Sequence, residues 1–140
     1  MKKTLFLLAI FFICIETSFA QTNPAITAWI QNHDGTTGRH YIANNPTPID
    51  DGVLANVQSV DYSDNWVYVS ATGIPSYITG PFLDNNPSLA TDQQAIYKIS
   101  LNPTQNTGTP TNTTGGNIGV FVNGVSLFDY RDGVRWDNNN

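Results

Sequence analysis

Two apolar runs near the C-terminal end of this chain are separated by the pair Asn123-Gly124. Asn-Gly between apolar residues is a strong signal for a β-hairpin, because both central residues of a type I′ turn need positive φ. Asn and Gly adopt this conformation more readily than other residues do. The pair therefore predicts a tight hairpin within the stretch Gly116–Val134.

The predicted hairpin is apolar on both faces. A two-residue turn places the valines and Leu127 on one face, and Phe121 and Phe128 diagonally on the other. Since a two-stranded ribbon alone is marginal in water, we expect an ordinary core hairpin of a sandwich, with part of its cover encoded beyond residue 140. The expected pairs are Val122 with Val125, Val120 with Leu127, and Ile118 with Asp129.

The rest of the chain also favours strands over helices. No window after Gln21 keeps a helical apolar period for more than about two turns, and short β-branched and aromatic runs alternate with turn residues. We therefore expect a mainly β fold. It should be antiparallel and β-sandwich-like, incomplete within these 140 residues, with long polar loops and little helix.

Two runs alternate as half-buried strands do. In WVYVSAT, Trp66, Tyr68 and Ser70 project to one side and Val67, Val69 and Ala71 to the other; VLANVQSVDY before it completes a plausible hairpin. In AIYKISL, Tyr97, Ile99 and Leu101 share one face, and Lys98 and Ser100 the other. The remaining segments are a helix or strand at Pro24–Gln31, polar connectors at His33–His40, Asn44–Asp51 and Asn102–Asn117, and a long excursion at Gly73–Asp92 with one short strand around Tyr77-Ile78.

The first twenty residues have the pattern of a secretory signal peptide. Two lysines precede the apolar run Leu5–Ile15, and Ser18-Phe19-Ala20 is a small-x-small cleavage pattern. The apolar run is too short for a helix that crosses a bilayer, which takes roughly 20 residues. We predict cleavage between Ala20 and Gln21 and export to the periplasm or the medium. Residues 21–52 then form an N-terminal segment with polar loops, and residues 53–140 a β domain.

The charge and cysteine content exclude several partners and one means of stabilisation. Cleavage removes two lysines and Glu16, which changes the formal net charge from −5 to −6. Such an acidic surface repels nucleic acid and anionic lipid, so we expect neither nucleic acid nor a membrane as a partner after cleavage. Cys14, the single cysteine, leaves with the signal, and the mature chain therefore has no disulfide.

Several blocks of the chain, in order, resemble the N-terminal part of the YHYH family of exported bacterial proteins. The blocks are GIPSYITGPF, AIYKISLNP, TGTPT and GNIGVFVNGVSLFDYRDG, and they lie between about Val53 and Val134. The most specific piece is G-x-x-V-N-G-V, Gly119–Val125. The resemblance implies that the Tyr-His-Tyr-His motif follows this hairpin after a further stretch. The chain has no such motif, so no functional residue carries over from the family.

The resemblance leaves the reaction unassigned and implies a scaffold for a downstream histidine-containing site that binds a metal. Within the chain, His33 and His40 flank a glycine-rich loop that also holds Asp34 and Arg39. Zinc and copper sites need several convergent ligands. The two histidines are therefore weak metal candidates, and exposed loop histidines are the ordinary interpretation. The identity of any cofactor stays open.

No catalytic constellation is present, so enzymatic activity is uncertain. The chain has no nucleophile elbow, no phosphate loop and no cysteine after cleavage. Ten aspartates permit many carboxylate pairs, but the spacing selects none. The segments Asp61–Asn65 and Asp129–Gly133 resemble pieces of calcium loops but lack the full residue order, and Asx turns explain them better.

The aromatic residues provide an alternative function. Trp66, Tyr68, Tyr77 and Phe82 could stack on sugar rings if a β-sandwich exposes them on one face. Aromatic side chains more often build a core. A carbohydrate-binding or adhesive module is thus the alternative to the scaffold, and the oligomeric state stays open.

Overall fold

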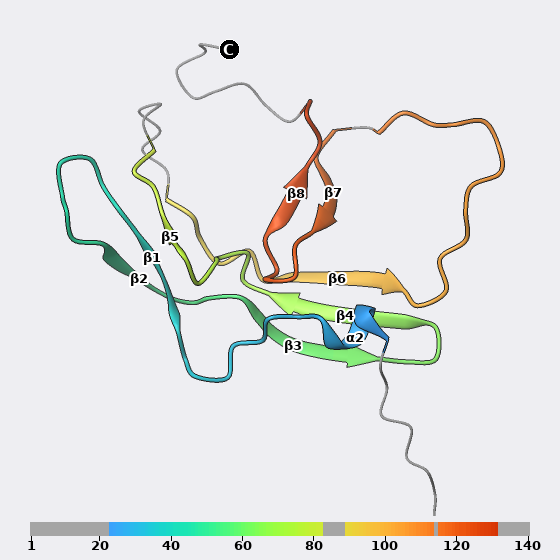
Figure 1. The fold of residues 1–140 in the computed structure, drawn as a ribbon, viewed down its shortest axis with the longest axis horizontal. Coiled ribbons are helices and arrows are strands. Elements are labelled where there is room, and N and C mark those ends of the chain that lie inside the picture. Colours follow the sequence, from blue (N-terminus) through green and yellow to red (C-terminus); the bar gives the residue numbers. More distant parts are fainter. Residues whose placement is uncertain (1–22, 83–88, 114, 132–140) are drawn as a thin grey trace, which may run out of the picture.

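The computed structural model describes residues 23–82, 89–113 and 115–131. The chain is mainly β, as expected, and these residues form one helical turn and eight strands in three small sheets, β2-β1-β5, β3-β4-β6 and β7-β8 (Figure 1). The predicted signal peptide lies outside the described residues. The elements are α2 (Pro24–Thr27), β1 (Thr37–His40), β2 (Ile49–Leu54), β3 (Val57–Tyr62), β4 (Trp66–Ala71), β5 (Ile78–Thr79), β6 (Ala95–Ser100), β7 (Asn117–Val120) and β8 (Ser126–Phe128).

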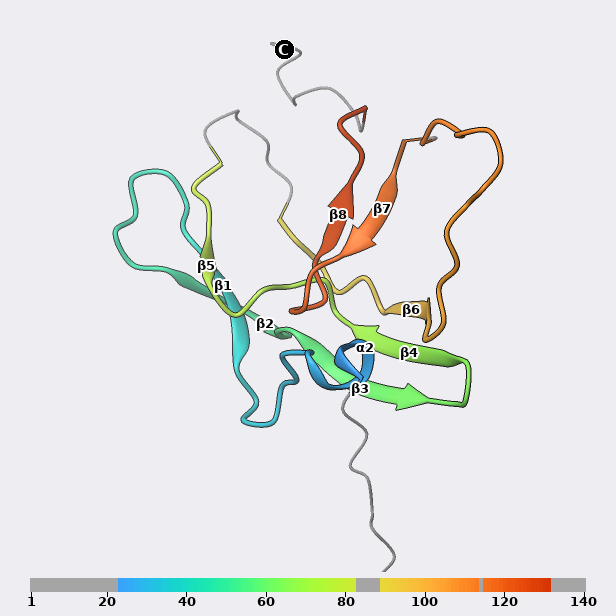
Figure 2. The same ribbon diagram turned by 45° about the vertical axis from the view of Figure 1, so that its right-hand side comes forward.

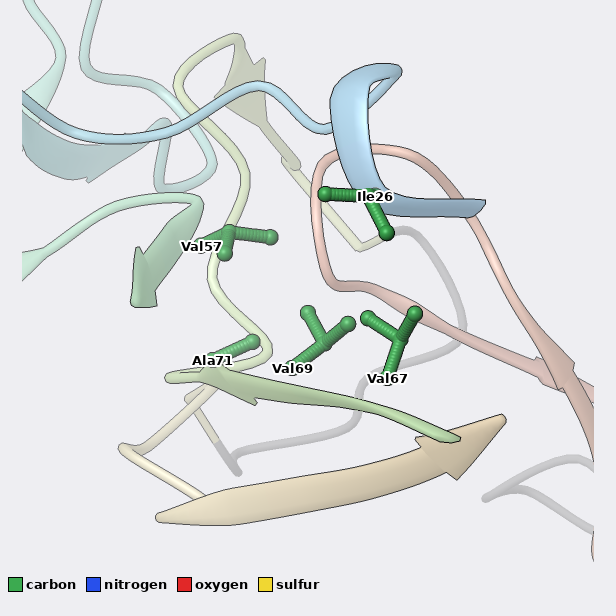
Figure 3. Close-up of a cluster of buried hydrophobic side chains, with 5 residues drawn as sticks. All are labelled: Ile26, Val57, Val67, Val69 and Ala71. Atoms are coloured by element: carbon green, nitrogen blue, oxygen red, sulfur yellow. The ribbon is translucent and has the colours of Figure 1, made fainter. Parts of the chain in front are cut away.

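The core lies on one face of the antiparallel β3-β4-β6 sheet. Val67, Val69 and Ala71 of β4 point from the same side of the strand toward Ile26 of α2, and Val57 of β3 completes the cluster (Figure 3). This alternation is the predicted one. Burial of these apolar side chains is the main source of stability here, at about 25 cal/mol per Å² of apolar surface.

A short N-terminal helix covers this core. The side chain of Asn23 accepts a hydrogen bond from the N–H of Ala25, and Pro24 occupies the first turn, where its missing N–H costs nothing. After the helix ends, Gln31 forms a parallel bridge with Val57. Of the two alternatives for this segment, the helix is therefore found in its first half and extended chain in its second.

The β2-β1-β5 sheet corrects two of the predicted connectors. His33–His40 contains strand β1 and Asn44–Asp51 contains the start of β2, which pair antiparallel. The predicted short strand in the long excursion is β5, and it pairs parallel with β1. The buried Gly38 in β1 makes room for Ile74, because a Cβ there would overlap the Ile74 side chain. This contact joins residues that are far apart in the sequence, so no alternation of apolar and polar residues predicts strand β1.

The β7-β8 hairpin is confirmed, but the predicted two-residue turn is wrong. The loop has three residues, 122–124: the N–H of Phe121 donates to the carbonyl of Val125, and the N–H of Gly124 donates to the carbonyl of Phe121, both at 2.8 Å. Gly124 takes a φ of 81°, whereas Asn123 is not among the residues with positive φ. This is the pattern of a type I turn that is closed by a glycine bulge.

The three-residue loop shifts the strand pairing by one residue, and such a shift changes which side chains share a face. Phe121 therefore lies on the same face as Val125 and Leu127, and the predicted face of valines and leucine is not formed. The observed pairs are Val120 with Ser126, Gly119 with Leu127, and Asn117 with Phe128, with an irregularity between the last two.

The tip of the hairpin rests on the core, and its strands extend away from the β3-β4-β6 sheet (Figures 1 and 2). A Cβ added to the buried Gly124 would overlap the Cβ of Ala71 and lie 3.4 Å from Cγ2 of Val57. The hydroxyls of Tyr97 and Ser126 form a hydrogen bond of 2.7 Å. The hairpin is thus attached at one end by close backbone packing and a polar contact.

Away from its tip, the hairpin leaves much of its apolar surface exposed. Ile118, Phe121 and Phe128 are each about half exposed, although they come from both faces. This agrees with the prediction that the hairpin is apolar on both sides. In the part of the chain that the structure describes, no helix is long and apolar enough to cross a membrane.

Asn and Asp side chains hold many of the turns. In nine places within the described ranges, Oδ1 of an Asn or Asp accepts a hydrogen bond from the backbone N–H two residues later, which is the Asx motif. Half of the Asn and Asp residues in the described ranges therefore serve turn formation. The nine acceptors are Asn23, Asp34, Asn45, Asp50, Asp92, Asn106, Asn117, Asn123 and Asp129.

Candidate ligand-binding face

The side of the β3-β4-β6 sheet opposite the core carries the candidate site. Since the hairpin tip and α2 pack on the core side, neither covers this second side. Two aromatic residues of β4, Trp66 and Tyr68, lie on it, as the alternation of the strand predicts. We call it the outer face, and its residues are Ser59 and Asp61 of β3, Trp66, Tyr68 and Ser70 of β4, and Ile96, Lys98 and Ser100 of β6.

A lysine from the neighbouring strand lies over the aromatic pair. Lys98 is directly opposite Tyr68 in the β4-β6 register and diagonal to Trp66. Its ammonium is 4.2 Å from the ring centroid of Trp66 and 5.9 Å from that of Tyr68. An exposed cation–π contact of this kind contributes about 0.5–1 kcal/mol. It holds both the lysine and the indole in defined positions.

The other end of the outer face is hollowed and lined by both polar and apolar groups. A pocket of about 380 Å³ opens there, and its lining offers amide, hydroxyl and carboxylate groups. Ser70 on this lining lies four residues from Trp66 along β4, which corresponds to about 13 Å at a strand rise of about 3.3 Å per residue. The lining residues are Gln58, Ser70, Ala71, Thr72, Asp92, Gln94 and Ile96.

Two of the four aromatic candidates lie elsewhere. Tyr77 lines a separate pocket with Ile30 and the hairpin residues Phe121, Val122 and Asn123. Phe82 follows β5 and is half exposed. The expectation that exposed aromatic residues gather on one face therefore holds for Trp66 and Tyr68 and not for the other two.

Comparison with known proteins adds one finding at this point. The family model described as YHYH protein matches residues 96–140. The resemblance to the YHYH family is confirmed. The match begins in β6 and includes the hairpin. Of the four blocks, GIPSYITGPF lies outside it, as does the rest of the chain from Val53 to residue 95. Neither the search of curated proteins nor the search of solved structures gives a match.

The YHYH match and the outer face share only strand β6. Ile96 and Lys98 fall within the YHYH region, whereas Trp66 and Tyr68 precede it. The outer face is therefore assembled from β3 and β4, which precede the matched residues, and from β6, which lies within them. The β4-β6 register places Lys98 beside Trp66 and Tyr68, and it thereby connects the matched residues to the strand that precedes them.

The two histidines have different surroundings. His40 ends β1 and is buried, and its Nδ1 is hydrogen-bonded to the carboxylate of Asp51 on β2. His33 is exposed in the loop before β1. The interpretation as an exposed loop histidine is therefore correct for His33 and wrong for His40, because the loop ends in a strand. No sequence signal links His40 to Asp51, which lies on another strand.

The described residues contain no group of three or more His, Cys, Asp or Glu side chains that could hold a metal ion. A site that includes His33 and His40 stays a prediction. Whatever ligands such a site requires beyond these two would have to come from residues outside the described ranges, since metal sites need several convergent donors.

Asp129 of the YHYH region has a structural role. It accepts hydrogen bonds from the Thr113 hydroxyl and from the backbone N–H and Nε of Arg131. The Thr113 hydroxyl, followed by the two Arg131 donors, lowers the pKa of Asp129 below its ordinary value. The Asx-turn interpretation is therefore confirmed for this segment. For Asp61–Asn65 it is wrong, because a backbone bond from Ser63 to Trp66 closes that loop.

Proposed function

We propose that this protein is exported and binds polysaccharide through the outer face. The observation that supports the proposal best is the pair Trp66 and Tyr68, which lie side by side on the outer face of β4 with a pocket at the end of the same face; Trp66 is exposed and Tyr68 is half-buried. Export is supported by the signal-peptide pattern of residues 1–20. The charge of the chain makes nucleic acid and anionic lipid poor alternatives as ligands.

The chemistry of the outer face suits a sugar chain. Sugar rings present apolar C–H faces and a rim of hydroxyl groups, so they need an aromatic surface and nearby hydrogen-bonding groups. Trp66 and Tyr68 supply the first, and the amides and hydroxyls of the pocket supply the second. Trp66 lies about 13 Å along β4 from Ser70 at the pocket, with Tyr68 between them, and this span favours a ligand of several linked sugars over a single sugar.

Trp66→Ala should abolish or strongly weaken this binding. We expect at least about a tenfold loss of affinity, because removal of a central aromatic anchor costs about 2 kcal/mol. Affinity gel electrophoresis of the protein purified after export, in gels that contain a panel of polysaccharides, measures the effect. Tyr77→Ala is the matched control, since Tyr77 is an exposed aromatic residue away from the outer face.

The same gels separate binding from misfolding. Both variants should still unfold in a cooperative thermal melt, because neither side chain belongs to the buried core. Equal retardation of Trp66→Ala and the unmodified protein would contradict the proposal. So would unchanged mobility of the unmodified protein across the whole panel.

We also propose a second function, in which the domain supports a histidine-containing metal site. The support is the hairpin in the YHYH region, whose apolar residues stay exposed on both faces. Under this proposal, further chain would pack on the hairpin and bring metal ligands with it. The resemblance to the family implies such a segment, and the hairpin would fix its position.

The metal content of the natural gene product tests this second function. The complete product of the reading frame should retain about one zinc or copper ion per molecule after dialysis without chelator. The chain of residues 21–140 should retain none under the same conditions. Elemental analysis by mass spectrometry measures both. A natural product that is free of metal would rule out the supporting role.

A further inference from the structure

We infer that the polysaccharide carries carboxylate groups and that Lys98 binds one of them. The inference rests on the proposed polysaccharide binding and specifies the class of ligand. It starts from the position of Lys98, which is exposed and whose ammonium lies over the Trp66 ring at 4.2 Å from the ring centroid. A cation placed at an exposed aromatic surface can pair with an anionic ligand that packs on the same surface.

Lys98 has no carboxylate partner among the described residues. The ion pairs there join His40 to Asp51 and Arg131 to Asp129. Asp61 lies on the same face, opposite Tyr68 in the β3-β4 register, yet it forms no ion pair with the lysine. In a chain with an excess of acidic residues, a cation that is held on aromatic rings and left unpaired remains available to an anionic group.

The lysine also disfavours a neutral ligand. A neutral sugar could stack on this side of the Trp66 ring only if it displaced the ammonium and so broke the cation–π contact. A sugar with a carboxylate can leave the ammonium in place and add an ion pair to it. The geometry therefore discriminates between acidic and neutral polymers at the same aromatic surface.

The negative charges around the outer face limit its attraction for an anionic ligand to the contact with Lys98. Asp61 flanks the aromatic pair, and Asp92 lines the pocket at the other end of the face. The net charge of the chain opposes polyanions at long range, and salt at 0.15 M confines such repulsion to about 8 Å. Binding to an acidic polysaccharide should therefore depend on Lys98 in particular and not on a basic surface.

Polygalacturonate and highly methyl-esterified pectin test the inference, because they share a backbone and differ in charge. We expect polygalacturonate to retard the unmodified protein more than the esterified polymer does. Lys98→Gln should weaken the binding of polygalacturonate about three- to fivefold. It should not weaken the binding of the esterified polymer and should strengthen it, because a neutral sugar no longer has to displace the ammonium from Trp66. Arg39→Gln is the matched control, since it removes one exposed positive charge on β1, in the other three-stranded sheet.

The outcomes distinguish the inference from the proposed function. Equal retardation by the two polymers, or binding of polygalacturonate that Lys98→Gln does not change, overturns the role of Lys98 while polysaccharide binding stands. Equal losses in Lys98→Gln and Arg39→Gln also overturn it, because the effect would then be one of net charge. If neither polymer nor any other in the panel binds, the proposed function itself fails.

Discussion

Gly124→Ala is expected to lower the free energy of unfolding by about 2–5 kcal/mol, a large part of the total for a small domain. Two effects add. The new Cβ would overlap the Cβ of Ala71, and neither backbone can withdraw without loosening the hairpin tip from the core. The φ of 81° is also unfavourable for alanine. Urea denaturation at pH 7 measures the loss.

Gly52→Ala is the matched control for this change. Gly52 has a similar φ of 66°, but a Cβ there would meet nothing within 4 Å. It should therefore cost only the backbone part, about 1–2 kcal/mol. The double variant Gly124→Ala with Ala71→Gly removes the overlapping atom and should recover part of the difference. Equal losses in Gly124→Ala and Gly52→Ala would show that the hairpin tip does not rest on the core.

His40→Ala is expected to cost about 2–4 kcal/mol. The substitution removes a buried ring and leaves the carboxylate of Asp51 without its hydrogen-bond partner between β1 and β2. Asp51→Asn should cost less, because the amide oxygen can still accept a hydrogen bond from the imidazole N–H. Urea denaturation of the variants at pH 7 gives the ranking.

His33→Ala provides the comparison for His40→Ala. His33 is exposed, and substitutions at such positions usually change stability by less than about 0.5 kcal/mol. A large difference between the two histidine variants is therefore expected. Similar, small losses in both would mean that the pair of His40 and Asp51 does not hold the β2-β1-β5 sheet together.

The sequence predicts those strands whose residues alternate regularly between apolar and polar. The two-residue alternation from Trp66 to Ala71 assigns each side chain of β4 to the correct face, because one face of this strand is buried and the other is not. Strands β1 and β2 give no such signal. Their pairing depends on the buried Gly38 and on His40 with Asp51, which are contacts between distant residues.

The Asn-Gly pair predicts the hairpin but not the length of its loop. Asn-Gly fits a two-residue turn, and it equally fits a three-residue loop with the glycine in the bulge. Contact between Gly124 and Ala71 is a tertiary feature that the local sequence does not contain. The candidate site is likewise only partly predictable from the local sequence. Alternation predicts that Trp66 and Tyr68 lie on the face away from the core, but the position of Lys98 depends on the β4-β6 register.

The turns that the Asx motifs form do not depend on the charge of the residue that forms them. Asn and Asp offer the same Oδ1 acceptor, so either residue can hold such a turn. Four of the nine positions are aspartates, namely 34, 50, 92 and 129. Exchange of the three exposed ones, 34, 50 and 92, for asparagine would raise the formal net charge from −5 to −2 and keep the Oδ1 acceptor of each turn. Asp129 differs, because it is buried and its Oδ2 also accepts from the Thr113 hydroxyl. Three of the turns can therefore form with or without a negative charge on the exterior.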